Sequence, residues 1–259
     1  MNAKLAPYSV AVIIPAMNEE ENLSGTVMAV LDELRARFST YEILIVDDGS
    51  TDRTGEIADG LAATNSRIRA IHNSRNLGLG YSYTRGVELA RMEYVAWFPG
   101  DNEIPRQAIK AILSAIGSAE ILVPYIANPN VRTRARRLIS GAFVGFLNLI
   151  FGLQLRYFNG PCVYSRRFLM SVSIKSSGFA CFAAILIRSI LSGHSYAEIP
   201  ILTETRQYGR TKAFRLRNLL SVFGTVIELS WDVYVRDRRK YVGAGQRIEW
   251  RPESLASQL

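Results

Sequence analysis

The chain has few of the residues that build disulfide frameworks and metal centres, with two cysteines and two histidines among 259 residues. Cys162 and Cys181 show no metal-ligand spacing and are too few for a disulfide scaffold, so we expect reduced, buried thiols. His72 and His194 have no recognisable partner pattern, and we interpret both as structural. Residues 1–10 lack the apolar core of a signal peptide, and we therefore expect the protein on the cytosolic side.

Acidic residues are outnumbered, at 23 against 31 lysines and arginines, which gives a net charge of +8. This excess favours anionic partners such as nucleotides, lipid phosphates or an acidic membrane leaflet. The basic residues flank apolar segments instead of alternating with exposed aromatics, so we do not expect nucleic acid as a partner. With 48% hydrophobic and 21% charged residues, the composition excludes wholesale disorder and a multi-span membrane protein.

The first hundred or so residues alternate between strand and helix patterns. A nearly unbroken β-branched run at residues 10–15 predicts a strand buried on both faces, and further strands are expected at 42–46, 68–72 and 94–98. Between the first two strands we expect a helix capped by Asn18 and started by the acidic residues that follow it. This order predicts a doubly wound sheet with its ligand crevice at the carboxyl ends of the strands.

Polar clusters follow two of these strands, at residues 47–52 and 99–103. Asp47 or Asp48 can accept a hydrogen bond from a base or a ribose hydroxyl, while Asp101 with Glu103 offers oxygen ligands suited to magnesium or manganese. Acidic residues at strand ends are also ordinary helix caps, and that interpretation stays open for each cluster taken alone.

Two later segments combine apolar runs with basic flanks, at residues 138–155 and 214–235. The first is about as long as a bilayer-spanning helix, which takes roughly 20 apolar residues, but polar and glycine positions interrupt it. An interfacial helix pressed against lipid headgroups is the favoured interpretation, ahead of a spanning helix or a soluble core helix. From residue 241 onward the chain is polar, and we expect a flexible tail.

Residues 14–19, 46–52 and 76–80 resemble, in order and spacing, the motifs of family 2 glycosyltransferases. Residues 206–212 are similar to the Arg-x-x-Gly-x-Ser-Lys motif of the branch that contains dolichol-phosphate mannose synthases and bacterial polyprenyl-phosphate glycosyltransferases. The resemblance implies a GT-A α/β domain over residues 1–240, with a mostly parallel central sheet flanked by helices and additional amphipathic membrane-interface helices. It also implies inverting transfer of a sugar from a nucleotide-sugar donor to a polyprenyl phosphate, by an enzyme peripheral or monotopic at the cytoplasmic membrane face.

The resemblance further assigns roles to individual residues. Asp101 would be catalytic and would hold Mg²⁺ or Mn²⁺ together with Glu103, and Arg206 and Lys212 would be catalytic by neutralising phosphates. The lipid phosphate would be held at the start of the apolar segment by Arg132, Arg136 and Ser140. The residues expected to bind the nucleotide are Pro15, Met17, Glu19, Asp47, Asp48, Arg75 and Gly78.

Two departures from the family pattern leave alternatives open. Pro99 stands where the family's first metal-binding aspartate is expected, and residues 157–161 replace the acceptor-side motif. The chain is therefore either an enzyme with one protein metal ligand fewer or a membrane-bound binding protein without activity. A transferase acting on a soluble or polysaccharide acceptor is a further alternative.

Overall fold

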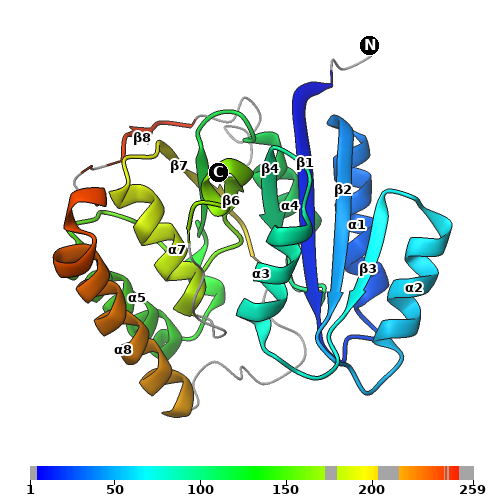
Figure 1. Cartoon of the computed structure of the whole chain (residues 1–259), viewed down its shortest axis with the longest axis horizontal. Helices are drawn as coiled ribbons and strands as arrows, with labels where there is room; N and C mark the ends of the chain where they lie inside the picture. Colours follow the sequence, from blue (N-terminus) through cyan, green and yellow to red (C-terminus); the bar gives the residue numbers. More distant parts are fainter. Residues whose placement is uncertain (1–4, 173–179, 204–215, 242, 244, 251–259) are drawn as a thin grey trace.

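The computed structural model describes residues 5–172, 180–203, 216–241, 243 and 245–250. Within these residues the strands form one eight-stranded sheet in the order β3-β2-β1-β4-β6-β5-β7-β8 (Figure 1). The strand bounds are β1 (Ala6–Ala16), β2 (Phe38–Asp47), β3 (Ile68–His72), β4 (Tyr94–Trp97), β5 (Ile121–Ile126), β6 (Val163–Ser165), β7 (Tyr196–Ile201) and β8 (Arg247–Ile248).

The first four strands are parallel and lie where the sequence predicts them. The central strand β1 is buried on both faces: Val10, Val12 and Ile14 point into one hydrophobic cluster, and Ala11 and Ile13 into the other. Because the strands are parallel, their carboxyl ends meet at one edge of the sheet, and the polar clusters of the sequence follow β2 and β4 at that edge.

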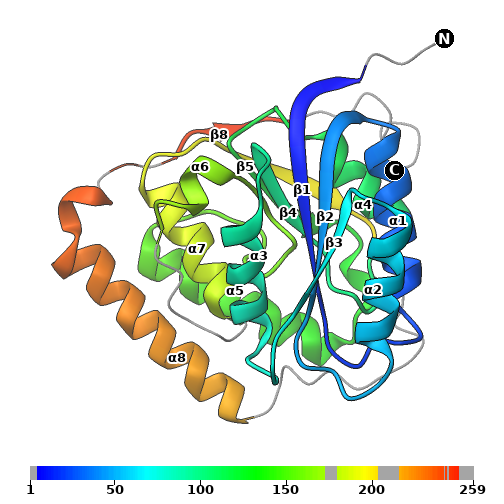
Figure 2. The same cartoon turned by 45° about the vertical axis from the view of Figure 1, so that its right-hand side comes forward.

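Helices cover both faces of the sheet (Figure 2). The cluster on one face includes residues of α1, α2 and α4, and that on the other includes residues of α3, α5, α7 and α8. The bounds are α1 (Leu23–Arg35), α2 (Thr54–Thr64), α3 (Leu79–Leu89), α4 (Arg106–Ser114), α5 (Arg134–Phe151), α6 (Arg166–Leu169), α7 (Ala180–Leu191) and α8 (Leu216–Trp231).

The second half of the sheet departs from simple alternation. The short strand β6 lies antiparallel between β4 and β5, and β5 then pairs in parallel with β7. The sheet therefore has two parallel parts joined by one antiparallel strand, and the connection from β5 to β6 carries the long helix α5.

The start of α1 differs from the sequence prediction. Asn22 occupies the N-cap position, and the first turn of the helix contains no acidic residue. Asn18 instead has a left-handed backbone with φ of 56°, and its side-chain oxygen accepts a hydrogen bond from the Thr51 amide at 2.9 Å. The predicted cap therefore joins the loop after β1 to the loop after β2.

The two segments expected at a membrane interface form helices that lie side by side (Figures 1 and 2). Helix α5 ends at Gly152, whose φ of 65° is left-handed, and α8 continues into a π-helical turn at Asp232–Arg236. The Tyr234 hydroxyl donates to the Ile150 carbonyl, and its ring stacks on Phe151 with centroids 6.3 Å apart. Among the helices of the described residues, none has both the length and the apolar character needed to cross a membrane.

The region expected to be a flexible tail includes an edge strand, β8, which pairs in parallel with β7. Arg247 in β8 forms an ion pair at 2.6 Å with Glu198, a β7 residue whose side chain is buried. Ile248 and Trp250 pack against the core. For residues 247–250 the structure thus differs from the expected flexible tail, because the polar composition of the segment hides one ion pair with a buried carboxylate and two apolar contacts.

Candidate active site

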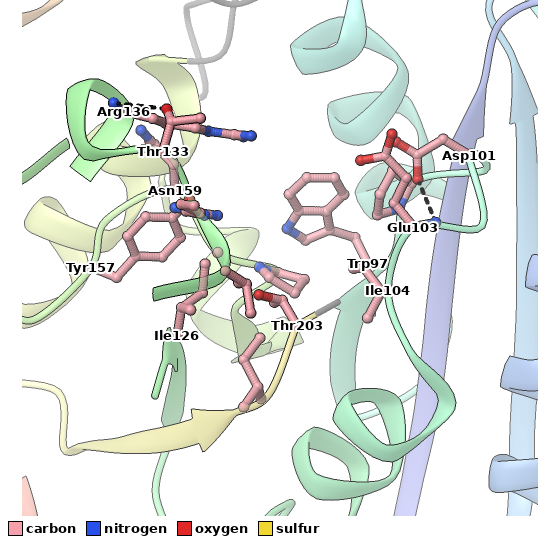
Figure 3. Close-up of a pocket in the computed structure, with 16 residues that line it drawn as sticks. Trp97, Asp101, Glu103, Ile104, Ile126, Thr133, Arg136, Tyr157, Asn159 and Thr203 are labelled. Carbon is pink, nitrogen blue, oxygen red and sulfur yellow. Dashed lines mark hydrogen bonds between the residues drawn. The ribbon is translucent and has the colours of Figure 1, made fainter. Parts of the chain in front are cut away.

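A cavity of about 400 Å³ opens at the carboxyl edge of the sheet. Figure 3 shows Asp101 and Glu103 on one side and Thr133, Arg136 and Tyr157 on the other. The cavity is lined by Trp97, Pro99, Asp101, Glu103, Ile104, Ile126, Val131, Arg132, Thr133, Arg136, Tyr157, Asn159, Gly160, Pro161, Ile201 and Thr203. Acidic and basic side chains from distant parts of the sequence therefore face a common space.

Asp48, one of the residues expected to bind the nucleotide, is engaged by the protein. It is buried, and its carboxylate accepts hydrogen bonds from the Leu77 and Gly78 amides at 3.0 and 2.9 Å and from the Asn73 side chain at 2.8 Å. A carboxylate that accepts several N–H groups is strongly held. Asp48 thus fixes residues 73–78, the loop that leads into α3.

Gly49 lets the loops after β2 and β3 approach each other. Its φ of +70° is left-handed, and a Cβ atom there would lie 2.4 Å from the carbonyl carbon of Arg75. Only glycine fits both the conformation and the space. The backbone of Arg75, another residue expected at the nucleotide site, is therefore in direct contact with the loop that carries Asp47 and Asp48.

Asp47 is held by the protein on both carboxylate oxygens. One oxygen accepts from the Ser50 amide at 3.1 Å, and the other lies 3.1 Å from His72 Nδ1. The other ring nitrogen of His72 lies 3.0 Å from an Asp59 oxygen in α2. The hydrogen bond with Asp47 raises the pKa of His72; its partial burial opposes this, and Asp59 adds to the increase. His72 thus has two acidic partners that its sequence context did not reveal.

The remaining residues expected at the nucleotide site lie around the same loops. Pro15 pairs with Val46 one step before the last β1–β2 pair, Ala16 with Asp47. Met17 is exposed, and its sulfur accepts from the side-chain amide of Asn76. The Glu19 amide donates to the Thr54 hydroxyl at 2.8 Å, and the Glu19 carboxylate accepts from Asn22. These contacts bring the ends of β1, β2 and β3 into one surface.

The acidic loop after β4 is anchored to α1. The Asn102 amide donates to the Thr26 hydroxyl at 3.0 Å, and Asn102 has a left-handed φ of 55°. The Glu103 amide donates to Asp101 Oδ1 at 3.2 Å, so the two acidic residues share one tight turn (Figure 3). Pro99 lies in the same cavity wall and offers no ligand atom in place of a carboxylate.

The carboxylate oxygens of Asp101 and Glu103 suit a divalent cation that takes the rest of its ligands from a substrate. Within the described residues there is no group of three or more His, Cys, Asp or Glu side chains arranged to hold a metal ion. Two carboxylates beside a cavity fit Mg²⁺ or Mn²⁺, because these ions bind oxygen and Mg²⁺ commonly keeps several waters or phosphate oxygens.

The opposite wall contains the N-terminus of α5. Thr133 caps the helix by accepting from the Arg136 amide, and Arg132 lies over the Tyr157 ring at 5.7 Å from its centroid. The partial positive charge of a helix N-terminus and two guanidinium groups make this wall favourable for an anion. Arg132 and Arg136 line the cavity, whereas Ser140, one turn further along α5, does not, and the expected binding of a lipid phosphate by these residues stays a prediction.

Arg206 and Lys212 lie outside the described residues, so their expected roles stay predictions. Sequence analysis missed Trp97, which lines the cavity, and the His72–Asp59 contact. Trp97 and His72 both lie in strands, where the sequence pattern does not distinguish a core residue from a site residue.

The chain matches the model of glycosyl transferase family 2 over residues 11–179. It is 27% identical to the glycosyltransferase AglD of Haloferax volcanii over 91% of the chain, and spans 39% of that relative's length. It is 27% identical to an undecaprenyl-phosphate mannosyltransferase of Micrococcus luteus, covering 78% of the chain and 86% of the relative. It is 28% identical to a polyprenol monophosphomannose synthase of Mycolicibacterium smegmatis, covering 78% and 79%.

The fold is also found in solved structures of low sequence identity. Glucosyl-3-phosphoglycerate synthase from Mycobacterium tuberculosis, solved with Mn²⁺, UDP-glucose and phosphoglyceric acid, superposes with a TM-score of 0.64 at 17% identity, over 86% of this chain and 80% of that one. The same enzyme has been solved with Mg²⁺ and UDP. The sheet, the polar strand ends and the family match over residues 11–179 agree, and the chain belongs to glycosyl transferase family 2.

Proposed function

We propose that this protein is an inverting hexosyltransferase that moves a sugar from a nucleotide-sugar donor to a polyprenyl phosphate. The observation that carries the proposal is the cavity with an acidic turn, Asp101 and Glu103, on one side and a basic helix end, Arg132 and Arg136, on the other (Figure 3). Two of the relatives named above are transferases for undecaprenyl or polyprenol phosphate, which supports a lipid phosphate as the acceptor.

In the proposed reaction, an oxygen of the acceptor phosphate attacks the anomeric carbon of the sugar. The new carbon–oxygen bond forms as the bond to the nucleoside diphosphate breaks, and the leaving diphosphate takes the electron pair. A phosphate monoester is already ionised at neutral pH, so this acceptor needs positioning more than a general base. Arg132, Arg136 and the N-terminus of α5 supply that positioning by attracting and orienting the phosphate.

Asp101 and Glu103 would hold the divalent cation of the donor complex. A cation bound there supplies charge neutralisation for the leaving diphosphate. The protein itself contributes the rigid turn: Thr26 on α1 fixes Asn102, and the Glu103 amide orients the Asp101 carboxylate. On the nucleoside side, Asp47 would accept from the base or ribose.

Peripheral attachment to a membrane fits the outer surface of α5 and α8. The exposed apolar side chains of these two elements and the turn after α8 are Leu138, Ile139, Phe146, Leu149, Ile227, Trp231, Tyr234 and Val235, which we call the apolar face. Arg236, Arg238, Arg239 and Lys240 follow it and can contact anionic headgroups. Helix α5 starts at the basic wall of the cavity and continues into the apolar face. The hydrocarbon chain of a lipid whose phosphate is bound at that wall would therefore lie near the apolar face.

The test is transfer from a panel of UDP- and GDP-sugars to polyprenyl phosphate in detergent or vesicles, with Mn²⁺, Mg²⁺ or EDTA. We expect a glycolipid product that requires the divalent cation. Transfer to phosphoglycerate or a polysaccharide without transfer to the lipid would favour a soluble-acceptor enzyme. Tight donor binding with no product from any acceptor would favour a binding protein, for which the Pro99 substitution is the observation in support.

A further inference from the structure

Trp97 is the last residue of β4, and its indole ring carries one polar group, an N–H. Its side chain is 6% exposed, and its indole nitrogen is buried without a hydrogen-bond partner in the part of the chain that the structure describes. An indole N–H can only donate, and buried donors are almost always paired with an acceptor. Among the buried hydroxyls without a partner in the described residues, those of Tyr83 and Tyr164 lie outside the cavity lining, whereas that of Thr203 lies in it. Of the two lining residues with such a group, Trp97 is the one that can only donate.

The ring is held in one orientation by aromatic neighbours. Phe182 of α7 stacks on it with centroids 4.2 Å apart and planes 12° from parallel, and Tyr83 of α3 packs against it at 6.2 Å. Figure 3 shows the nitrogen on the side of the ring turned toward Asn159 and away from Asp101 and Glu103. The donor is therefore fixed in position before any ligand arrives, which is the condition for effective recognition.

The position of the Trp97 indole N–H determines which part of the substrate it can contact. In the proposed function the diphosphate lies at Asp101 and Glu103, and the acceptor phosphate lies at Arg132 and Arg136. The sugar must then occupy the space between these two walls, where Figure 3 shows Trp97 between Asp101 and Glu103 on one side and Asn159 and Arg136 on the other. Sugar hydroxyl oxygens are neutral acceptors well suited to an indole N–H.

We propose that the Trp97 indole N–H donates a hydrogen bond to a hydroxyl oxygen of the sugar being transferred. This inference rests on the proposed function, because that function places a sugar in the cavity. It makes Trp97 a residue that selects the donor sugar by the position of one hydroxyl. A site that bonds a hydroxyl discriminates against an analogue that lacks it, because the buried N–H is then left unpaired.

The kinetic test is Trp97→Phe, which keeps an aromatic ring for stacking and removes the N–H. We expect kcat/KM for the sugar nucleotide to fall about three- to tenfold, the range for one neutral hydrogen bond, while UDP and GDP affinities stay within about twofold. With the wild-type protein, a deoxy-sugar donor that lacks the recognised hydroxyl should have a kcat/KM lower than that of the normal donor by a similar factor. With Trp97→Phe, removing that hydroxyl should lower kcat/KM little further. Trp250→Phe, which removes another partly buried indole, is the matched control and should leave kinetics unchanged.

A binding measurement tests the same idea without the variant, in case Trp97→Phe folds poorly. Wild-type protein labelled with ¹⁵N in its three tryptophans should show the Trp97 indole resonance moving on saturation with UDP-glucose or GDP-mannose, and moving much less with UDP or GDP. The Trp231→Phe and Trp250→Phe spectra assign the other two resonances.

Each outcome has a defined meaning. An unmoved Trp97 resonance at saturation, or an equal shift with nucleotide alone, overturns the assignment, as does unchanged kcat/KM in folded Trp97→Phe. If the sugar nucleotide shifts the resonance but no lipid product forms, the proposed acceptor fails and the Trp97 assignment stands. If neither of these sugar nucleotides nor any other in the panel binds, both proposals fail.

Discussion

Asp47 and Asp48 are neighbours in sequence with different tasks. Asp48 accepts hydrogen bonds from Asn73, Leu77 and Gly78, and these bonds fix the loop before α3. Asp47 accepts from one backbone amide and otherwise faces His72. From the sequence alone both are equal candidates for the nucleoside, because only the fold shows that Asp48 already accepts three hydrogen bonds from the protein.

Replacing Asp101 tests the acidic wall of the cavity. We expect Asp101→Ala to lower the transfer rate by several orders of magnitude, because the leaving diphosphate loses the carboxylate that would hold its cation. Steady-state transfer with titrated Mn²⁺ is the measurement, and Glu56→Ala, at an exposed acidic residue of α2, is the control. A loss of less than tenfold, about 1.4 kcal/mol of barrier, would contradict this role.

His72 predicts a pH dependence of stability. Its pKa is raised in the folded protein, first by the hydrogen bond with Asp47, so the folded state favours the protonated ring. This contribution is complete below the unfolded pKa of 6.5 and is lost as pH rises through the higher folded pKa. We expect the thermal midpoint of wild type to fall over that window relative to His72→Gln. Parallel curves for the two proteins from pH 5 to 9 would rule the effect out.

At the scale of single elements, the loop after β2 depends on glycine. Gly49→Ala places a Cβ atom against the Arg75 backbone and requires a left-handed conformation, which costs about 1–2 kcal/mol before any clash. We expect lower stability and weaker UDP or GDP binding. Gly60→Ala in α2, where a Cβ meets nothing within 4 Å, is the control and should stabilise by about 0.5–1 kcal/mol. Chemical denaturation and nucleotide titration compare the two, and similar behaviour would refute the close-approach argument.

The apolar face of α5 and α8 gives a second prediction for elements. Leu149→Ser and Ile227→Ser should weaken binding to anionic vesicles, and salt should weaken wild-type binding, because both apolar burial and basic anchors contribute. Met28→Ser, at an exposed residue of α1 on the other side of the sheet, should have no effect. Vesicle cosedimentation measures this. Binding that survives both substitutions and high salt would mean that attachment lies elsewhere.

Strands β1 to β4 follow from sequence because parallel buried strands are continuous apolar runs between turn formers. The start of α1 cannot be read from the sequence, because Asn18 and Asn22 are both residues that favour the N-cap position. Only the hydrogen bond from Thr51 to Asn18, which the fold creates, shows that Asn18 has another role. Asp101 and Arg136 reach the predicted cavity because their motifs flank strongly patterned elements. Trp97 carries no such signal, since an aromatic residue inside a strand is ordinarily core.

At the scale of the whole molecule, the edge strand β8 closes the sheet beside β7. Arg247→Ala should cost roughly 2 kcal/mol, because it removes a charged partner from the buried Glu198 carboxylate. Arg53→Ala, which breaks an ion pair whose side chains are 76% and 75% exposed, should change stability by less than about 1 kcal/mol. Urea unfolding measures both, and equal effects would show that β8 contributes little.

The antiparallel strand β6 joins the part of the sheet that carries Asp47 and Asp101 to the part from which α5 and its arginines extend. It pairs through Tyr94 and Val95 of β4 on one side and through Ile121 and Leu122 of β5 on the other. Each pairing covers only two residue pairs, so the two hydrophobic clusters that extend across β6, more than its hydrogen bonds, hold the two parts of the sheet together. A large change of side-chain volume where these clusters cross β6 would therefore alter the separation between Asp101 and Arg136, and with it the substrates that the cavity admits.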